Sequence, residues 1–229
     1  MKEKVTAGIA LVLGVVPAVC LLLVLSAVSV TRANSWETVF DEDGLLVERR
    51  AYSGSALQEI RGVIRLETSL NAVMALLKDA EFNREWVYRS GGARILEEEG
   101  FARAYVYGIV DAPWPMQDRD TVVRFDYSQE DSGEIAITIT NFPDFLPQAD
   151  EYVRVPDFGG YWRLRPQQDG WVEVTYQVYG DPGGWIPVWV ANYAAVTSVT
   201  RTLQAMASAV KHYTNAHSEF VRDVGENDS

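Results

Sequence analysis

The residue types that most often perform catalysis are sparse in this sequence. Only two histidines occur, His212 and His217, and both lie near the C-terminus. No serine–histidine–acid or cysteine–histidine arrangement is evident, and no histidine cluster has metal-ligand spacing. The glutamates at 97–99 lie at a predicted hairpin turn and are typical of a solvated surface rather than of an acid–base pair. The sequence therefore favours binding over catalysis, and it predicts no metal and no cofactor.

A second group of residues suits recognition of an amphipathic ligand. The segment 111–120, DAPWPMQDRD, places Trp114 between two prolines and Arg119 between two aspartates. Because the prolines restrict the backbone, Trp114 is either a packed corner between strands or an apolar tip that contacts lipid. Arg119 either pairs with Asp118, Asp120 or another acid and fixes the base of the loop, or offers its planar guanidinium to a phosphate.

Aromatic side chains supply further candidates. Tyr105 and Tyr107 share one face of a predicted strand. They are either ordinary core residues or, beside a pocket, wall residues whose hydroxyls bond a polar headgroup. The same two interpretations hold for Trp162, Tyr176, Trp189 and Tyr193. This supply of rings permits a cage around a quaternary ammonium group without showing one.

The first 34 residues differ from the rest of the chain. Val5 to Val30 is an uncharged run of 26 residues, preceded by two lysines and followed by Arg32. Such a run exceeds a signal-peptide core of about 7–15 residues and suffices for a spanning helix of about 20. Residues 1–34 are therefore either a cleaved signal peptide or an N-terminal transmembrane anchor. Both alternatives predict an exported protein, either periplasmic or anchored to the inner membrane and facing the periplasm.

The exported part is strongly acidic and has no thiol. It holds 17 basic and 31 acidic residues, a balance of −14, and the only cysteine of the chain, Cys20, lies in the apolar run. This charge excludes a nucleic acid partner and disfavours attraction to an anionic membrane. Contact with a membrane surface is therefore expected through apolar tips or the N-terminal segment. Without a second cysteine, no disulfide is expected.

The remainder of the chain predicts a single α+β domain over 35–215, followed by a polar tail at 216–229. Alternating apolar residues and Gly- or Ser-containing turns indicate antiparallel hairpins. The expected strands are 45–51, 57–66, 93–98, 101–110, 121–127, 134–141, 161–165 and 171–179. Apolar spacing predicts a helix from a cap at Thr68 or Ser69 to Asp79, with a short helical piece at 82–88.

The segment Val188 to Tyr213 predicts a long last helix. It contains no glycine or proline, and Arg201 and Lys211 are its only charged residues apart from the titratable His212. A surface helix normally has a strongly charged back, so more than one face of this helix is expected to be covered. The expected core face comprises Trp189, Tyr193, Val196, Thr200, Leu203, Ala207 and Val210. A curved sheet around such a helix either fills with side chains or leaves a pocket.

Three stretches resemble the steroidogenic-acute-regulatory-protein-related lipid-transfer (START) family. They are residues 112–120, the pair Val153–Arg154 before 160–164 (GYWRL), and 181–192 (DPGGWIPVWVAN). The first and last are most similar to the phosphatidylcholine-transfer branch, and the resemblance runs from about Trp36 to His212. It implies a helix-grip fold, a curved antiparallel sheet wrapped around the long C-terminal helix with an internal lipid cavity.

The resemblance also implies site residues. The loop 111–117 corresponds to a mobile flap, so Pro113, Trp114, Pro115 and Met116 are predicted to form a gate loop, and Arg119 matches a position near the polar end of the ligand. Sterol-binding relatives carry an internal acid and arginine that fall near Val106 or Tyr107 and near Phe125, which puts a sterol in doubt. The predicted cavity set is Tyr105, Tyr107, Arg119, Phe125, Trp162, Tyr176, Trp189 and Tyr193.

The resulting hypothesis is a monomeric, non-enzymatic protein that binds, and transfers, one amphipathic, phospholipid-like lipid between the sheet and the last helix. Two alternatives remain. One is a cyclase- or hydrolase-like enzyme on the same fold. The other is a ligand-sensing scaffold that does not transfer its ligand.

Overall fold

The computed structural model describes residues 35–218 and 221–222, and these form a ten-stranded sheet with helices on one side. The strands are β1 (Glu37–Glu42), β2 (Leu45–Ala51), β3 (Gln58–Glu67), β4 (Ser90–Glu99), β5 (Arg103–Val110), β6 (Arg119–Gln129), β7 (Ile135–Asn141), β8 (Val153–Arg154), β9 (Asp157–Pro166) and β10 (Trp171–Asp181). The helices are α2 (Leu70–Lys78), α3 (Asn83–Trp86) and α4 (Val188–Ala209), with 3-10 turns η1 (Gln168–Gly170) and η2 (Val210–Tyr213).

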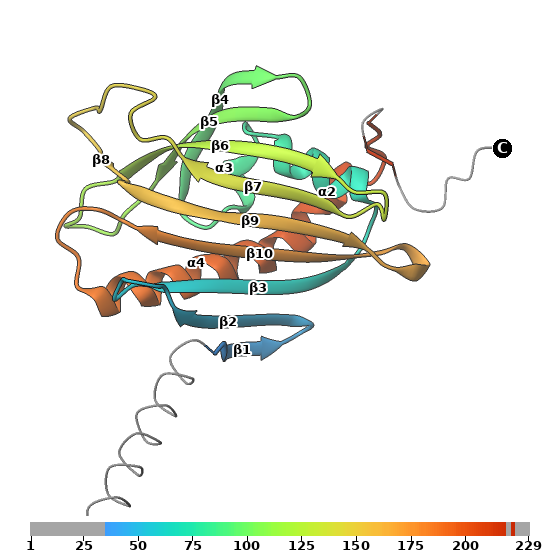
Figure 1. The fold of residues 1–229 in the computed structure, drawn as a ribbon, viewed down its shortest axis with the longest axis horizontal. Coiled ribbons are helices and arrows are strands. Elements are labelled where there is room, and N and C mark those ends of the chain that lie inside the picture. The colour runs from blue at the N-terminus through green and yellow to red at the C-terminus, as the bar shows by residue number, and fades with distance from the viewer. Residues whose placement is uncertain (1–34, 219–220, 223–229) are drawn as a thin grey trace, which may run out of the picture. The chain divides into compact units, whose positions relative to one another are not determined.

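The strands follow the order β1-β2-β3-β10-β9-β7-β6-β5-β4, all antiparallel, and β8 adds a short parallel pairing to β6. Figure 1 shows α4 behind β3, β10 and β9, on the same side of the sheet as α2 and α3. The predicted α+β architecture, a curved antiparallel sheet with a long C-terminal helix against it, is confirmed. Strands β1 and β8 were not predicted.

The last helix is held against the sheet by its C-terminal half. Its buried residues in the α-helical part are Val199, Thr202, Leu203, Met206 and Ala209. Gly62 of β3 lies beneath them, and a Cβ at this position would be 2.3 Å from Leu203 Cδ1 and 2.9 Å from Val199 Cγ1. The missing side chain therefore allows the helix to approach the strand closely.

The predicted start of α2 is confirmed. The Ser69 hydroxyl accepts a hydrogen bond from the Ala72 backbone N–H at 3.1 Å, and the backbone of Ser69 is extended, as an N-cap requires. The helix then buries Leu70, Val73 and Met74 against the sheet. This satisfied cap fixes the end of the helix that follows β3.

A hydrogen bond ties η2 to the end of α2. The Tyr213 hydroxyl donates to Asp79 Oδ2 at 2.7 Å, and this bond, followed by the Phe82 backbone N–H, lowers the pKa of Asp79 from its ordinary 3.8. The carboxylate therefore stabilises the fold above pH ~4, and this contribution is lost as the pH falls through the lowered folded-state pKa.

Replacing Tyr213 with phenylalanine is expected to lower the free energy of unfolding by about 1 kcal/mol at pH 7. The difference from the wild type should begin to shrink below pH ~4 and disappear once the pH is below the lowered pKa of Asp79 in the folded wild type, where both proteins carry a protonated Asp79. Urea unfolding at pH 7 and at about pH 3 measures this. A difference that stays constant with pH would mean that the contribution is not from the ionised carboxylate.

The predicted N-terminal segment, residues 1–34, and most of the predicted tail, 216–229, lie outside the described residues. Among the residues that are described, no helix is long and apolar enough to cross a membrane.

Candidate functional site

A partly open pocket of about 130 Å³ lies between the helices and the concave face of the sheet. The helical side contributes Leu77, Asn83, Trp86, Val87 and Thr202, and the sheet contributes Phe125, Tyr127, Ile137, Ile139, Phe158, Trp162 and Tyr176. Trp162 stacks on Tyr176 with ring centroids 3.8 Å apart, and Trp86 lies 6.4 Å from Trp162. The pocket is thus walled mainly by aromatic and aliphatic side chains.

Three of the predicted cavity residues, Phe125, Trp162 and Tyr176, line this pocket. They come together because β6, β9 and β10 direct alternate side chains toward the same face of the sheet. Burial raises the pKa of Tyr176, so its hydroxyl remains protonated throughout the physiological range. The other five predicted cavity residues lie elsewhere.

Tyr105 and Tyr107 point away from the pocket, contrary to the prediction. Tyr105 is paired with Arg124 across β5 and β6, whereas Phe125, which lines the pocket, is paired with Ala104. Neighbouring residues of a strand face opposite sides, so the two tyrosines lie on the outer face. There the Tyr105 ring stacks on Phe145 at 4.6 Å. Burial and then the carboxylate of Asp120 raise the pKa of Tyr107.

Trp189 and Tyr193 lie on the surface rather than in the pocket wall, with 74% and 71% of their area exposed. The reason is the rotation of α4. Its buried stripe passes through Val199, Leu203 and Met206, and an ideal helix turns about 100° per residue, which places the two aromatic residues outside this stripe. Before Val199 the helix has no buried residue, so its N-terminal half is covered less than the sequence predicted.

The predicted gate loop (residues 111–117) projects from the end of the sheet. Trp114 is 93% exposed, and the flanking prolines are exposed as well, whereas Met116 is partly buried. The Met116 N–H donates to the Pro113 carbonyl at 3.0 Å, and Asp118 Oδ1 accepts from the Ala112 N–H at 2.7 Å. The tip is therefore apolar and open to solvent, while the base is closed by hydrogen bonds.

Arg119 fixes the gate loop to the loop that precedes α4. Within the described residues no salt bridge joins it to Asp118 or Asp120, so the predicted pairing with an aspartate is wrong. Its guanidinium instead donates to the carbonyls of Gln117 and Pro182, the latter at 3.4 Å. The side chain is buried, and this burial lowers its pKa, an effect that Asp118 partly opposes. Arg119 does not line the pocket.

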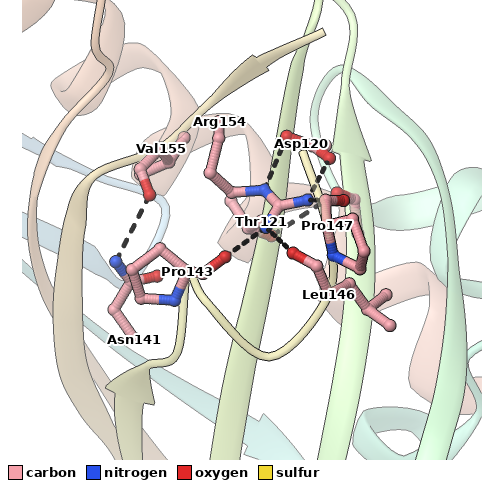
Figure 2. A network of polar contacts seen from close by, with 9 residues as sticks. Asp120, Thr121, Asn141, Pro143, Leu146, Pro147, Arg154 and Val155 are labelled. Carbon is pink, nitrogen blue, oxygen red and sulfur yellow. Dashed lines mark hydrogen bonds and ion pairs between the residues drawn. The ribbon is translucent and has the colours of Figure 1, made fainter. Parts of the chain in front are cut away.

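Asp120 is occupied by a different arginine, Arg154. The two side chains form a bidentate pair with distances of 2.9 and 2.8 Å, and neither is exposed by more than 7%. Figure 2 shows the guanidinium between this carboxylate and the carbonyls of Pro143, Leu146 and Pro147. The ion pair therefore anchors the whole segment between β7 and β8, and the hydrogen bond to Asp120 raises the pKa of Arg154.

Sequence reasoning missed two features of the region around α4. Trp185, in the loop before the helix, is 92% exposed. It lies between two glycines and a nearby proline, a pattern as distinctive as the one around Trp114. The second feature is Asn192, whose side chain accepts from the Gln58 N–H at 2.9 Å and donates to the Ala56 carbonyl at 3.3 Å. No local sequence signal marks this long-range contact.

Replacing Asn192 with alanine is expected to loosen the N-terminal half of α4, because its hydrogen bonds to Ala56, before β3, and to Gln58, the first residue of β3, are lost. Hydrogen exchange should become about tenfold faster at 188–198 and stay unchanged at 202–209. Gln204→Ala, an exposed change on the same helix, is the control. Equally faster hydrogen exchange along the whole helix would contradict the expectation that Asn192 stabilises only its N-terminal half.

Within residues 35–218 and 221–222, no three His, Cys, Asp or Glu side chains gather closely enough to hold a metal ion.

Comparisons with known proteins agree with this geometry. No family model matches the chain. An uncharacterized protein of Pseudomonas aeruginosa is 33% identical over 179 residues, which cover 78% of this chain and 88% of that protein. The phosphatidylcholine transfer protein of Bos taurus is 28% identical over 187 residues, covering 78% and 85%.

Among solved structures, a STAR-related lipid transfer protein from Xanthomonas axonopodis is 36% identical, with a TM-score of 0.73. The match covers 78% of this chain and 99% of that one. Identity at this level over nearly the whole of a solved domain, together with the sheet and helix described above, means that the chain belongs to the STAR-related lipid transfer (START) family.

Proposed function

We propose that the protein binds one amphipathic lipid between the sheet and α4 and exchanges it with membranes. The observation that carries this proposal is an exposed aromatic rim, made of Trp114, Trp185, Trp189 and Tyr193. Each of the four side chains is at least 71% exposed, and in this proposal they act as one apolar surface, the kind of surface that marks an interaction site. The choice of a lipid as the ligand is supported by the relatives that are described as lipid transfer proteins.

The loops that carry the two tryptophans lie at the same end of the sheet (Figure 1). Arg119 joins them, since it donates to the carbonyl of Gln117 in one loop and to that of Pro182 in the other. Tryptophan is favoured at membrane interfaces, where its ring is amphipathic. The domain is acidic, so this rim rather than electrostatic attraction would make the membrane contact. In this proposal Arg119 holds the two membrane-facing loops in a fixed position relative to each other.

Loading a lipid requires the pocket to enlarge. Its volume of about 130 Å³ is below the roughly 300–1,000 Å³ of ordinary ligand pockets. The N-terminal half of α4 is suited to move, because the buried residues of the helix begin only at Val199. The hydrogen bond of Asn192 to Gln58, at the start of β3, would have to break or shift during this movement. Lipid entry between this half-helix and the sheet would be driven by burial of acyl chain, at about 0.8 kcal/mol per methylene.

The small pocket also supports a second candidate, a ligand-sensing scaffold that does not transfer lipid. Two measurements distinguish the candidates. Lipid extracted from the purified protein is identified by mass spectrometry, and transfer of a fluorescent lipid between donor and acceptor vesicles is timed with and without protein. Bound lipid with catalysed transfer supports the first function, and bound lipid without transfer supports the second. Absence of both rejects lipid binding.

We also propose that the domain works outside the cytoplasm, with residues 1–34 as its anchor or cleaved signal. The uncharged run at 5–30 supports this proposal. Immunoblotting of periplasmic and membrane fractions tests it, since a cleaved protein is shorter and released whereas an anchored one keeps its full length in the membrane.

A further inference from the structure

The pocket lining carries no charged side chain among the described residues. Its residues in the described part of the chain include no Arg, Lys, His, Asp or Glu. The phosphate-binding candidate, Arg119, lies outside the lining and donates to two backbone carbonyls. Arg154 is neutralised by Asp120. A phosphate buried in this pocket would find no compensating charge in the lining, and burial of an unpaired charge is strongly unfavourable.

The polar side chains of the lining nonetheless leave hydrogen-bond donors available to a ligand. Asn83 Oδ1 accepts from the Ser90 hydroxyl at 2.6 Å, and Thr202 Oγ1 accepts from the Tyr88 N–H at 3.1 Å. Both side-chain oxygens are therefore already used as acceptors. The Asn83 amide group remains available as a donor.

Trp86 provides a further donor with no partner. Its side chain lines the pocket and is only 5% exposed, and within the described residues its indole Nε1 has no hydrogen-bond partner. Most buried polar groups in folded proteins are satisfied, so such an exception calls for a partner that arrives from outside.

Two phenols extend this set. No hydrogen bond to the hydroxyl of Tyr127 or Tyr176 occurs among the described residues. Burial raises the pKa of both, which keeps their hydroxyls protonated and able to donate. The lining therefore offers donors to an acceptor that the chain itself does not supply.

We propose that the pocket selects an uncharged ligand group bearing a hydrogen-bond acceptor, a ketone or ester carbonyl, held by Trp86 and Tyr176. This inference rests on the proposed lipid-binding function and narrows its ligand class. The carbonyl oxygen accepts from the indole N–H and from the phenol, and an attached hydrocarbon lies against Ile137, Ile139 and Phe158. A charged headgroup is left outside the pocket.

Matched probes of one chain length test the ligand class. Decan-2-one, decane and decanoate are compared on the full-length protein as competitors of a bound fluorescent lipid, and phosphatidylcholine vesicles form the fourth arm. Decan-2-one is expected to compete about tenfold more strongly than decane, and decanoate more weakly than decan-2-one. Equal competition by decane and decan-2-one would overturn the role of the donors.

Isosteric variants locate the contact. Trp86→Phe removes the indole N–H and Tyr176→Phe removes the hydroxyl, and each is expected to reduce the preference for decan-2-one over decane about fivefold. Trp171→Phe, at the far end of β10, is the matched control and should leave the preference unchanged. The readout is the ratio of the competition strengths of two ligands on the same variant. A general loss of stability affects both ligands equally and therefore does not change this ratio. An unchanged ratio in both pocket variants would refute the proposal.

The outcomes separate this inference from the function on which it rests. If phosphatidylcholine loads the protein while decan-2-one does not compete, the pocket does not select neutral ligands and the inference is wrong, although lipid binding stands. If neither loads, both the inference and the proposed function are wrong. Competition by decan-2-one that depends on Trp86 supports both.

Discussion

Replacing Arg154 with methionine is expected to lower the free energy of unfolding by about 3–5 kcal/mol, the usual cost of leaving a buried charge without its partner. The stranded group is Asp120, which has no exposed area. The same change removes the donors to the carbonyls of Pro143, Leu146 and Pro147, so the segment between β7 and β8 loses its anchor. Urea unfolding followed by circular dichroism measures the effect.

Two comparisons make this expectation specific. Arg163→Met removes a partly exposed arginine whose partner, Glu134, is still held by Arg165, so a much smaller loss is expected. In the double variant with Asp120→Asn, no buried charge is left unpaired, and the total loss should be less than the sum of the single losses. If Arg154→Met is no worse than Arg163→Met, the ion pair is not the anchor of the segment.

Removing both rim tryptophans, Trp114→Ala with Trp185→Ala, is expected to weaken vesicle binding by at least a hundredfold. A tryptophan ring buries roughly 150–250 Å², so half-burial in a bilayer at about 25 cal/mol per Å² contributes about 2–3 kcal/mol for each ring. This exceeds a factor of ten per residue. Co-flotation of the protein with neutral vesicles measures the change, and lipid transfer should slow in parallel.

The stability of this double variant should remain close to that of the wild type, because the two side chains are 93% and 92% exposed. Trp171→Ala is the control, since Trp171 begins β10 at the opposite end of the sheet and is 40% exposed. Loss of stability in proportion to loss of vesicle binding would mean that the two tryptophans have a structural role. Unchanged vesicle binding would remove the rim from the proposed mechanism.

Local patterns in the sequence were sufficient for the elements whose two faces differ. Ile135, Ile137 and Ile139 alternate with the smaller Ala136 and the polar Thr138, and all three isoleucines are buried in β7. The Ser69 cap and the apolar spacing after it define α2. In each case one face contacts the core and the other contacts water, so the period of the pattern indicates both the type of element and which of its faces is buried.

Where both faces are apolar, only the tertiary structure decided the orientation. β5 carries Tyr105 and Tyr107 on one side and Ala104 and Val106 on the other. Phe142 and Phe145, from a segment some forty residues later, cover the outer side, so the tyrosines pack there rather than in the pocket. The alternation alone cannot distinguish two covered faces.

The same reason explains the last helix. The sequence by itself determined a long, nearly uncharged helix and a tryptophan held between prolines, which with its family resemblance indicated a lipid-binding fold. An apolar surface on all sides does not mark its own core face, so the rotation of α4 was decided by Gly62, which admits Leu203 and Val199. The partners of Arg119 and Arg154 were likewise decided by the fold, because hydrogen bonds to Pro182 and Asp120 join residues distant in sequence.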